Sequence, residues 1–188
     1  MNRLFLSISI AFLGCMTSCS QPSQRQHNPD CPIKEETIKI GYSHHTNSGM
    51  ARYTSVQIYP DSLVWSYSEA RNGCSLGDIS RYDRKAFDEL IQTLSAISFA
   101  AKDAHNYPLG GSGFAYAFED KDGCYLSFQR GDDMSGDYME VYGAIQGFVN
   151  SHKTDCQKLF EKLSRMPHEK AMFGEFKELP EQLKKYNR

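Results

Sequence analysis

Two cysteines, Cys15 and Cys19, follow a short apolar run at the start of this 188-residue chain. The run, residues 4–13, comes after a basic residue, Arg3, and is too short to span a membrane. A basic start, a brief apolar stretch and a small-residue junction are typical of a signal peptide. We therefore expect residues 1–18 to direct export and to form no helix of the fold.

The junction resembles the lipobox of bacterial lipoproteins, where signal peptidase II cuts before a cysteine that becomes diacylated. Cys19 follows Met-Thr-Ser, whereas Cys15 follows Phe-Leu-Gly, and the two small residues before Cys19 fit the pattern better. The resemblance, which covers about the first twenty residues only, implies lipidation of Cys19, with Cys15 as the alternative. Ser20 replaces the aspartate that often retains such lipoproteins in the inner membrane. The resemblance thus implies an outer-membrane anchor that faces the periplasm.

Motifs that perform catalysis are absent from the sequence: it contains no G-x-S-x-G, no S-x-x-K and no H-E-x-x-H. Cys156, in "TDCQKLF", stands at the start of an expected helix, where a thiolate would be stabilised. However, Leu159, Phe160 and Leu163 share one helical stripe with it, which indicates a buried structural thiol. We therefore predict no catalytic residue and no enzymatic activity.

Four cysteines remain after the junction, and they allow three disulfide pairings. They are Cys31, Cys74, Cys124 and Cys156. Export would permit disulfides, but Cys124 alternates with Leu126 and Phe128 and so also fits a buried core thiol. Disulfides and free thiols both remain open. No C-x-x-C and no close Cys/His pair has ligand spacing, so we predict no metal site and no cofactor.

An acidic group surrounds the "RGDDMSGD" and "EDKDG" stretches and is the best candidate for partner binding. It comprises Glu119, Asp120, Asp122, Asp132, Asp133 and Asp137. Asp137 fits a helix cap, but Asp132 and Asp133 have no local structural task. Carboxylates of this kind would steer a protein with a basic surface, and His105 and Tyr107 in the neighbouring loop would add less polar contact. We therefore predict Asp132, Asp133, His105 and Tyr107 as binding residues.

Composition excludes two classes of protein. The formal net charge is −2 and no basic cluster is present, which argues against nucleic-acid binding. The mean hydropathy is −0.55 and no second long apolar run follows the first, so membrane attachment is expected through lipid alone.

The periodicity predicts an α+β fold: an antiparallel sheet of about five to six strands with two to three helices packed on one face. Residues 36–68 alternate as a meander, and Asn72-Gly73 marks a turn before a short fourth strand. "FAYAFE" and "CYLSFQ" flank a hairpin turn. Helices are expected after Asp83, after Asp137 and from Thr154.

These patterns divide the chain into four parts. Residues 1–18 form the signal, residues 19–34 the lipidated cysteine and a flexible tether, and residues 35–165 a single domain. Residues 166–188 form a segment that packs back on that domain.

The expected function is that of a periplasm-facing, lipid-anchored binding protein without catalytic activity. An inhibitor or immunity protein against an envelope-active toxin or enzyme fits this description by analogy. The alternative is a cell-envelope enzyme or a glycan-binding accessory lipoprotein, which a cleft with clustered carboxylates and exposed aromatic side chains would favour.

Overall fold

The computed structural model describes residues 31–46, 52–69, 73–98, 113–131, 137–166 and 178–188. Within them, a six-stranded sheet runs in the order β4-β3-β2-β1-β5-β6, with every neighbouring pair antiparallel. The strands are β1 (Lys39–Thr46), β2 (Arg52–Tyr59), β3 (Ser62–Glu69), β4 (Cys74–Arg81), β5 (Gly113–Asp120) and β6 (Gly123–Gly131).

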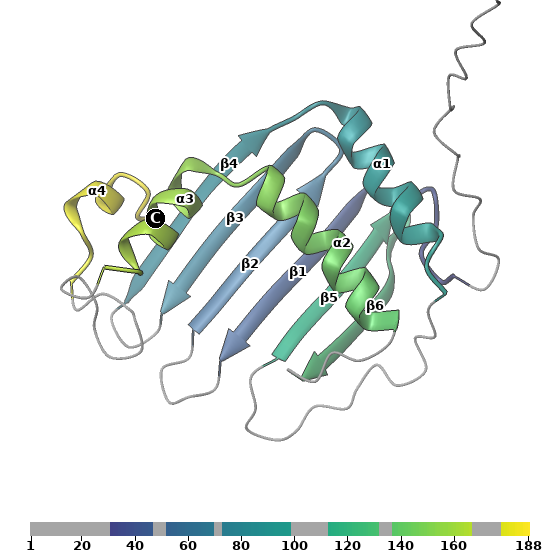
Figure 1. The fold of residues 1–188 in the computed structure, drawn as a ribbon, viewed down its shortest axis with the longest axis horizontal. Helices are drawn as coiled ribbons and strands as arrows, with labels where there is room; N and C mark the ends of the chain where they lie inside the picture. Colours follow the sequence, from purple (N-terminus) through teal and green to yellow (C-terminus); the bar gives the residue numbers. More distant parts are fainter. Residues whose placement is uncertain (1–30, 47–51, 70–72, 99–112, 132–136, 167–177) are drawn as a thin grey trace, which may run out of the picture.

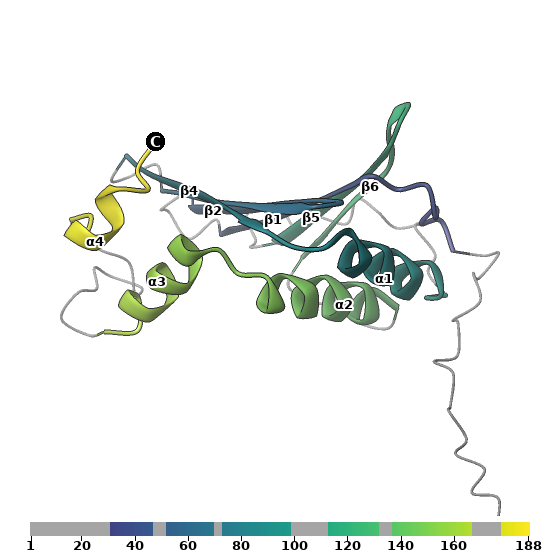
Figure 2. The same ribbon diagram turned by 90° about the horizontal axis from the view of Figure 1, so that it is seen from above.

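The helices α1 (Arg84–Ser95), α2 (Asp137–Ser151) and α3 (Asp155–Leu163) lie on one side of this sheet (Figures 1 and 2). A short helix, α4 (Glu181–Lys184), lies at the β4 end of the molecule. The predicted α+β class, with an antiparallel sheet covered on one face, is confirmed. Among the described residues, no helix is long and apolar enough to cross a membrane.

Side-chain caps fix where two helices begin. The Asp83 carboxylate accepts the backbone N–H of Lys85 at 2.8 Å, and the Thr154 hydroxyl accepts that of Gln157 at 3.1 Å. Such bonds satisfy donors that the first helical turn leaves unpaired. Both caps are at the positions that the sequence predicts. A third contact ties α3 to the sheet, because Asp78 on β4 accepts the N–H of Cys156 at 3.0 Å.

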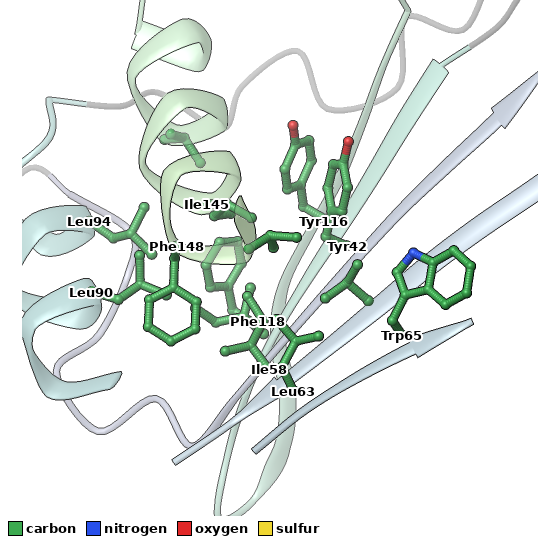
Figure 3. Packing of buried hydrophobic residues seen from close by; sticks show 14 of the residues in the cluster. Tyr42, Ile58, Leu63, Trp65, Leu90, Leu94, Tyr116, Phe118, Ile145 and Phe148 are labelled. Atoms are coloured by element: carbon green, nitrogen blue, oxygen red, sulfur yellow. The ribbon is translucent and has the colours of Figure 1, made fainter. Parts of the chain in front are cut away.

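The core lies between the sheet and α1 and α2. Figure 3 shows Ile58, Leu63 and Phe118 from the strands opposite Leu90 and Leu94 of α1 and Ile145 and Phe148 of α2. Cross-strand register places Phe118 beside Ile40, and Ile40 beside Ile58, so that apolar side chains form continuous rows on the helix side. These side chains are almost fully buried. The apolar half of each alternating strand therefore builds one contiguous core.

The folded chain begins before Glu35, where the sequence places the start of the domain. Ile33 is fully buried, and the Cys31 thiol donates to the Leu94 carbonyl at 3.3 Å. Burial raises the pKa of this thiol above its ordinary value. Residues 31–34 thus belong to the packed domain and not to a tether.

Residues 178–188 pack on the domain at β4. Leu183 is fully buried, and the backbone of Tyr186–Arg188 runs antiparallel to the outer edge of β4. Gly77 donates to the Tyr186 carbonyl at 3.1 Å, and Arg188 donates to the Ser75 carbonyl at 3.0 Å. This pairing covers backbone groups that an edge strand would otherwise leave open.

The interpretation of Cys124 as a core residue is wrong. Cys124 is exposed, because the β5–β6 register shifts between Phe118 and Glu119. Leu126 pairs with Phe118 but Cys124 pairs with Glu119, which leaves one extra residue on β6. Such a bulge reverses the alternation of side chains beyond it. The four cysteines of the described residues are free thiols in this structure.

Candidate binding face of the sheet

The sheet has two unlike faces. Alternate residues of each strand point toward the helices, and the others point to the side that carries no helix, which we call the open face (Figure 2). On β1, for example, Ile40 and Tyr42 are buried under the helices, so Gly41 and Ser43 belong to the open face. None of the described elements covers the open face, except where Arg188 reaches onto it at β4.

Small uncharged side chains dominate the centre of the open face. The register aligns them in two central cross-strand rows. These rows consist of Gly41, Ser43, Ser55, Gln57, Val64, Ser66, Gly77, Ile79, Ala115, Ala117, Ser127 and Gln129. Long charged side chains are the usual occupants of a surface that only contacts water. The central rows instead bring the backbone close to the surface.

A hollow of about 310 Å³ lies over β2, β1, β5 and β6 in these rows. Its open-face lining is Gly41, Ser43, Ser55, Gln57, Ala115, Ala117, Ser127 and Gln129. A Cβ atom on Gly41 would lie 3.4 Å from the Gln57 amide and 3.6 Å from Ala117 Cβ, so glycine keeps the floor low. The lining hydroxyls and amides can both donate and accept hydrogen bonds. Because most of the lining surface is apolar, the hollow suits an uncharged group that carries both apolar and polar atoms.

Charged side chains on this side of the sheet form pairs at one end of the strands. Lys39 contacts Glu119 at 2.8 Å, and Arg81 contacts Asp61 at 3.0 Å. The hydrogen bond that Lys39 donates to Glu119 raises the pKa of Lys39 above its ordinary value. These pairs leave little net charge along that end of the open face.

Arg188 lies on the open face at its β4 edge. A Cβ atom on Gly77 would be 3.0 Å from Arg188 Nε and 3.2 Å from Arg188 Cζ, so the guanidinium rests directly above the glycine. Arg188 is itself exposed. Its backbone is held by the pairing of Tyr186–Arg188 with β4.

The predicted binding residues Asp132, Asp133, His105 and Tyr107 lie outside the described residues, as does the predicted lipidation site, Cys19. Part of the acidic group is described, at the β5–β6 turn. This turn is at the opposite end of the hairpin from Gly131, which precedes Asp132. The acidic residues described at this turn are Glu119, Asp120 and Asp122.

Lysines neutralise most of the acidic charge at that turn. Asp120 contacts Lys34 at 2.8 Å, and Glu119 contacts Lys39. The hydrogen bond from Lys34 lowers the pKa of the Asp120 carboxyl below its usual range. Lys121 lies in the same turn. The hairpin tip thus presents balanced charge instead of an acidic patch.

Cys156 is a buried thiol, as the sequence predicts. Its side chain is fully buried, and burial, with a smaller contribution from the Asp78 charge, raises its pKa to about 12. A thiol with this pKa stays protonated at neutral pH and is a poor nucleophile. Within the described ranges, no three His, Cys, Asp or Glu side chains are grouped closely enough to hold a metal ion.

Comparison with known proteins adds no relative: no family model matches the chain, and no curated protein sequence matches it.

Sequence reasoning missed the open face, although its signal is present in the strands. The same alternation that identifies Ile40 and Tyr42 as core residues leaves Gly41 and Ser43 between them. On β5, the residues that alternate with the core residues and point away from the helices are Ala115 and Ala117. A strand whose outward residues are consistently small indicates a surface built for close contact. This pattern can be recognised without a structure.

Proposed function

We propose that the protein is a non-catalytic binding protein that is anchored by a lipid on Cys19 and displayed on the periplasmic side of the outer membrane. Its open face binds a protein partner. An inhibitor or immunity protein that neutralises an envelope-active toxin or enzyme is the function that this arrangement supports best. The observation that carries the proposal is the uncharged, small-residue centre of the open face.

The size of the open face supports a protein partner. Strands lie about 4.8 Å apart and rise about 3.3 Å per residue, so six strands of at least eight residues offer a face of about 750 Å². A standard protein interface buries about 800 Å² on each partner. The open face therefore has the area of one side of a stable complex.

The composition of the open face supports the same partner class. Interface centres are depleted in charged residues, and charged residues are absent from the two central rows. Small side chains cost little conformational entropy when a partner covers them. Except at the β4 edge, where Arg188 lies over Gly77, a partner can thus approach the sheet closely without desolvating unpaired charges.

Replacement of Ser55 by arginine tests this proposal. Ser55 lines the hollow, so Ser55→Arg puts a long charged side chain at the centre of the open face. The tagged protein is cross-linked in its own envelope and the captured proteins are quantified. We expect Ser55→Arg to lose the specific partner, because an unpaired charge would be buried on binding.

Ser98→Arg is the matched control, since Ser98 is exposed after α1 and away from the open face. It should capture the partner as the unchanged protein does. Equal capture by Ser55→Arg and Ser98→Arg, with unchanged thermal unfolding of both, would refute a role for the open face.

Lipid anchoring is tested separately. Cys19→Ala should move the protein from the membrane fraction to the soluble periplasm, whereas Cys15→Ala should leave it on the membrane. Release by Cys15→Ala alone would place the lipid on the other cysteine.

The hollow favours a second candidate function, a glycan-binding accessory. Its hydroxyl and amide lining matches sugar hydroxyl groups, and Tyr53, two residues from Ser55 on the same face, is 52% exposed. An exposed aromatic ring beside such a lining can stack on a sugar. Co-sedimentation with purified cell-wall sacculi, lost in Ser55→Arg and kept in Ser98→Arg, would favour this candidate over a protein partner.

A further inference from the structure

The backbone at Arg188 is held in place by its pairing with the outer edge of β4. Its backbone N–H donates to the Ser75 carbonyl at 3.0 Å, and the neighbouring Asn187 forms a bridge with Leu76. The side chain then crosses the β4 edge and rests over Gly77. Because Gly77 has no Cβ, the guanidinium lies against the backbone of the strand.

Arg188 differs from two other cations near the open face in its ion pairing. Lys39 and Arg81 each contact a carboxylate. Among the described residues, none of the carboxylates forms an ion pair with Arg188. Its guanidinium therefore keeps its donors available above the sheet.

A guanidinium is planar and presents five N–H donors in a fork that matches a carboxylate. Ser66 lies beside Gly77 in the register, and Ser75 lies two residues away on the same face. These hydroxyls can complete the hydrogen bonds of a bound carboxylate. We propose that Arg188 binds a carboxylate of the partner above Gly77, an inference that rests on the proposed role of the open face.

The distance between this site and the hollow indicates what the partner must present next to its carboxylate. Gly77, Ser66 and Ser55 are consecutive in one cross-strand row, and Ser55 lines the hollow. Two strand spacings separate Gly77 from Ser55, which is about 10 Å. The partner thus presents an acidic side chain about 10 Å from an uncharged polar segment that enters the hollow. This requirement is independent of the expected contact between a basic surface and Asp132 and Asp133.

The test is an NMR titration of the full chain with two synthetic peptides. One is acetyl-Gly-Ser-Glu-Ser-Gly-amide, and the other carries Gln in place of Glu. The Arg188 Nε–Hε signal reports directly on carboxylate binding. We expect a saturable shift of this signal with the Glu peptide and at least about tenfold weaker binding of the Gln peptide.

Two variants distinguish the effect of the guanidinium's position from the effect of nearby positive charge. Gly77→Ala keeps every charge but requires the guanidinium to move by a few tenths of an ångström, so it should weaken binding of the Glu peptide. Lys185→Gln removes a charge three residues before Arg188 and should leave the shift unchanged. An Arg188 signal that responds equally to both peptides, or that is unaffected by Gly77→Ala, would overturn the inference. Tighter binding of inorganic phosphate than of the Glu peptide would overturn the assignment to a carboxylate.

The partner experiment separates this inference from the proposed function. Loss of capture in Ser55→Arg together with full capture in Arg188→Gln refutes the Arg188 site and leaves the open face as the docking surface. Full capture in both variants refutes the proposed function itself. Thermal unfolding of Arg188→Gln establishes that the variant is folded.

Discussion

The two faces of the sheet are built by the same strands but have opposite characters. Toward the helices, the residues are large and buried, with Trp65 and Phe118 almost inaccessible. Toward the open face, their strand neighbours are Ser66 and Ala117. Strand alternation places both sets with the same backbone geometry, so backbone preference does not explain the difference. The face under the helices, which we call the covered face, holds the core that stabilises the fold. The open face adds little to that core and is available for binding.

Residues of the open face are not those of an ordinary solvated sheet surface. Serine, glycine and alanine stabilise strands poorly, because they give little cross-strand packing. A surface evolved only for stability and solubility would carry β-branched and charged side chains there. The open face gives up that stabilisation and gains close access to the backbone. This cost is consistent with a docking surface.

The largest expected difference in the free energy of unfolding is between two variants on β5, one on the covered face and one on the open face. Phe118→Ala should lower the free energy of unfolding by about 3–5 kcal/mol, because it leaves a cavity in the core. Ala117→Ser, one residue away on the other face, should change it by less than about 0.5 kcal/mol. Denaturant unfolding measures both values. Similar losses in the two variants would show that Ala117 also carries packing.

An intermediate effect is expected where the sheet holds α3. Asp78→Ala removes the acceptor of the Cys156 N–H at a partly buried helix start, and should cost about 1–3 kcal/mol. Asp61→Ala removes a carboxylate paired with Arg81 where both side chains are largely exposed, and should cost less than about 1 kcal/mol. An equal cost for the two aspartates, measured by denaturant unfolding, would contradict a specific role for Asp78.

The smallest effect concerns pH at the hairpin tip. Because Lys34 lowers the pKa of Asp120 in the folded chain, the pair stabilises the fold above the unfolded carboxyl pKa of about 3.9. That contribution is lost as the pH falls through the lower folded pKa. The difference in unfolding free energy between the unchanged protein and Asp120→Asn should therefore shrink from pH 7 to pH 2. In a Lys34→Met background the same difference should be small at every pH, and a difference that grows toward acid would contradict the ion pair.

Much of the fold can be predicted from the sequence because its signals are local. Alternation over β1 to β3, the hairpin turn before β6, and the caps at Asp83 and Thr154 each depend on a few neighbouring residues. The errors involve contacts between distant segments. Ile33 packs in a core assembled from later elements. The predicted short β4 pairs with β3 along all eight of its residues, and Tyr186–Arg188 pairs with its outer edge.

The candidate site was harder to predict for the same reason. Arg188 and Gly77 are more than one hundred residues apart in the sequence, and no local pattern connects the two. The hollow requires four strands in correct register. In contrast, the bulge that exposes Cys124 depends on a one-residue shift that alternation alone does not show.

The most direct measurement is site-specific photo-crosslinking in the living envelope. A photoreactive amino acid is placed at Ser55, in the hollow, or at Ser98, beyond α1, and each protein is irradiated before extraction. We expect a discrete protein adduct from position 55 and none from position 98. An adduct that forms only from position 98, or no adduct from position 55 while the protein is correctly anchored, would contradict the open face as the binding surface.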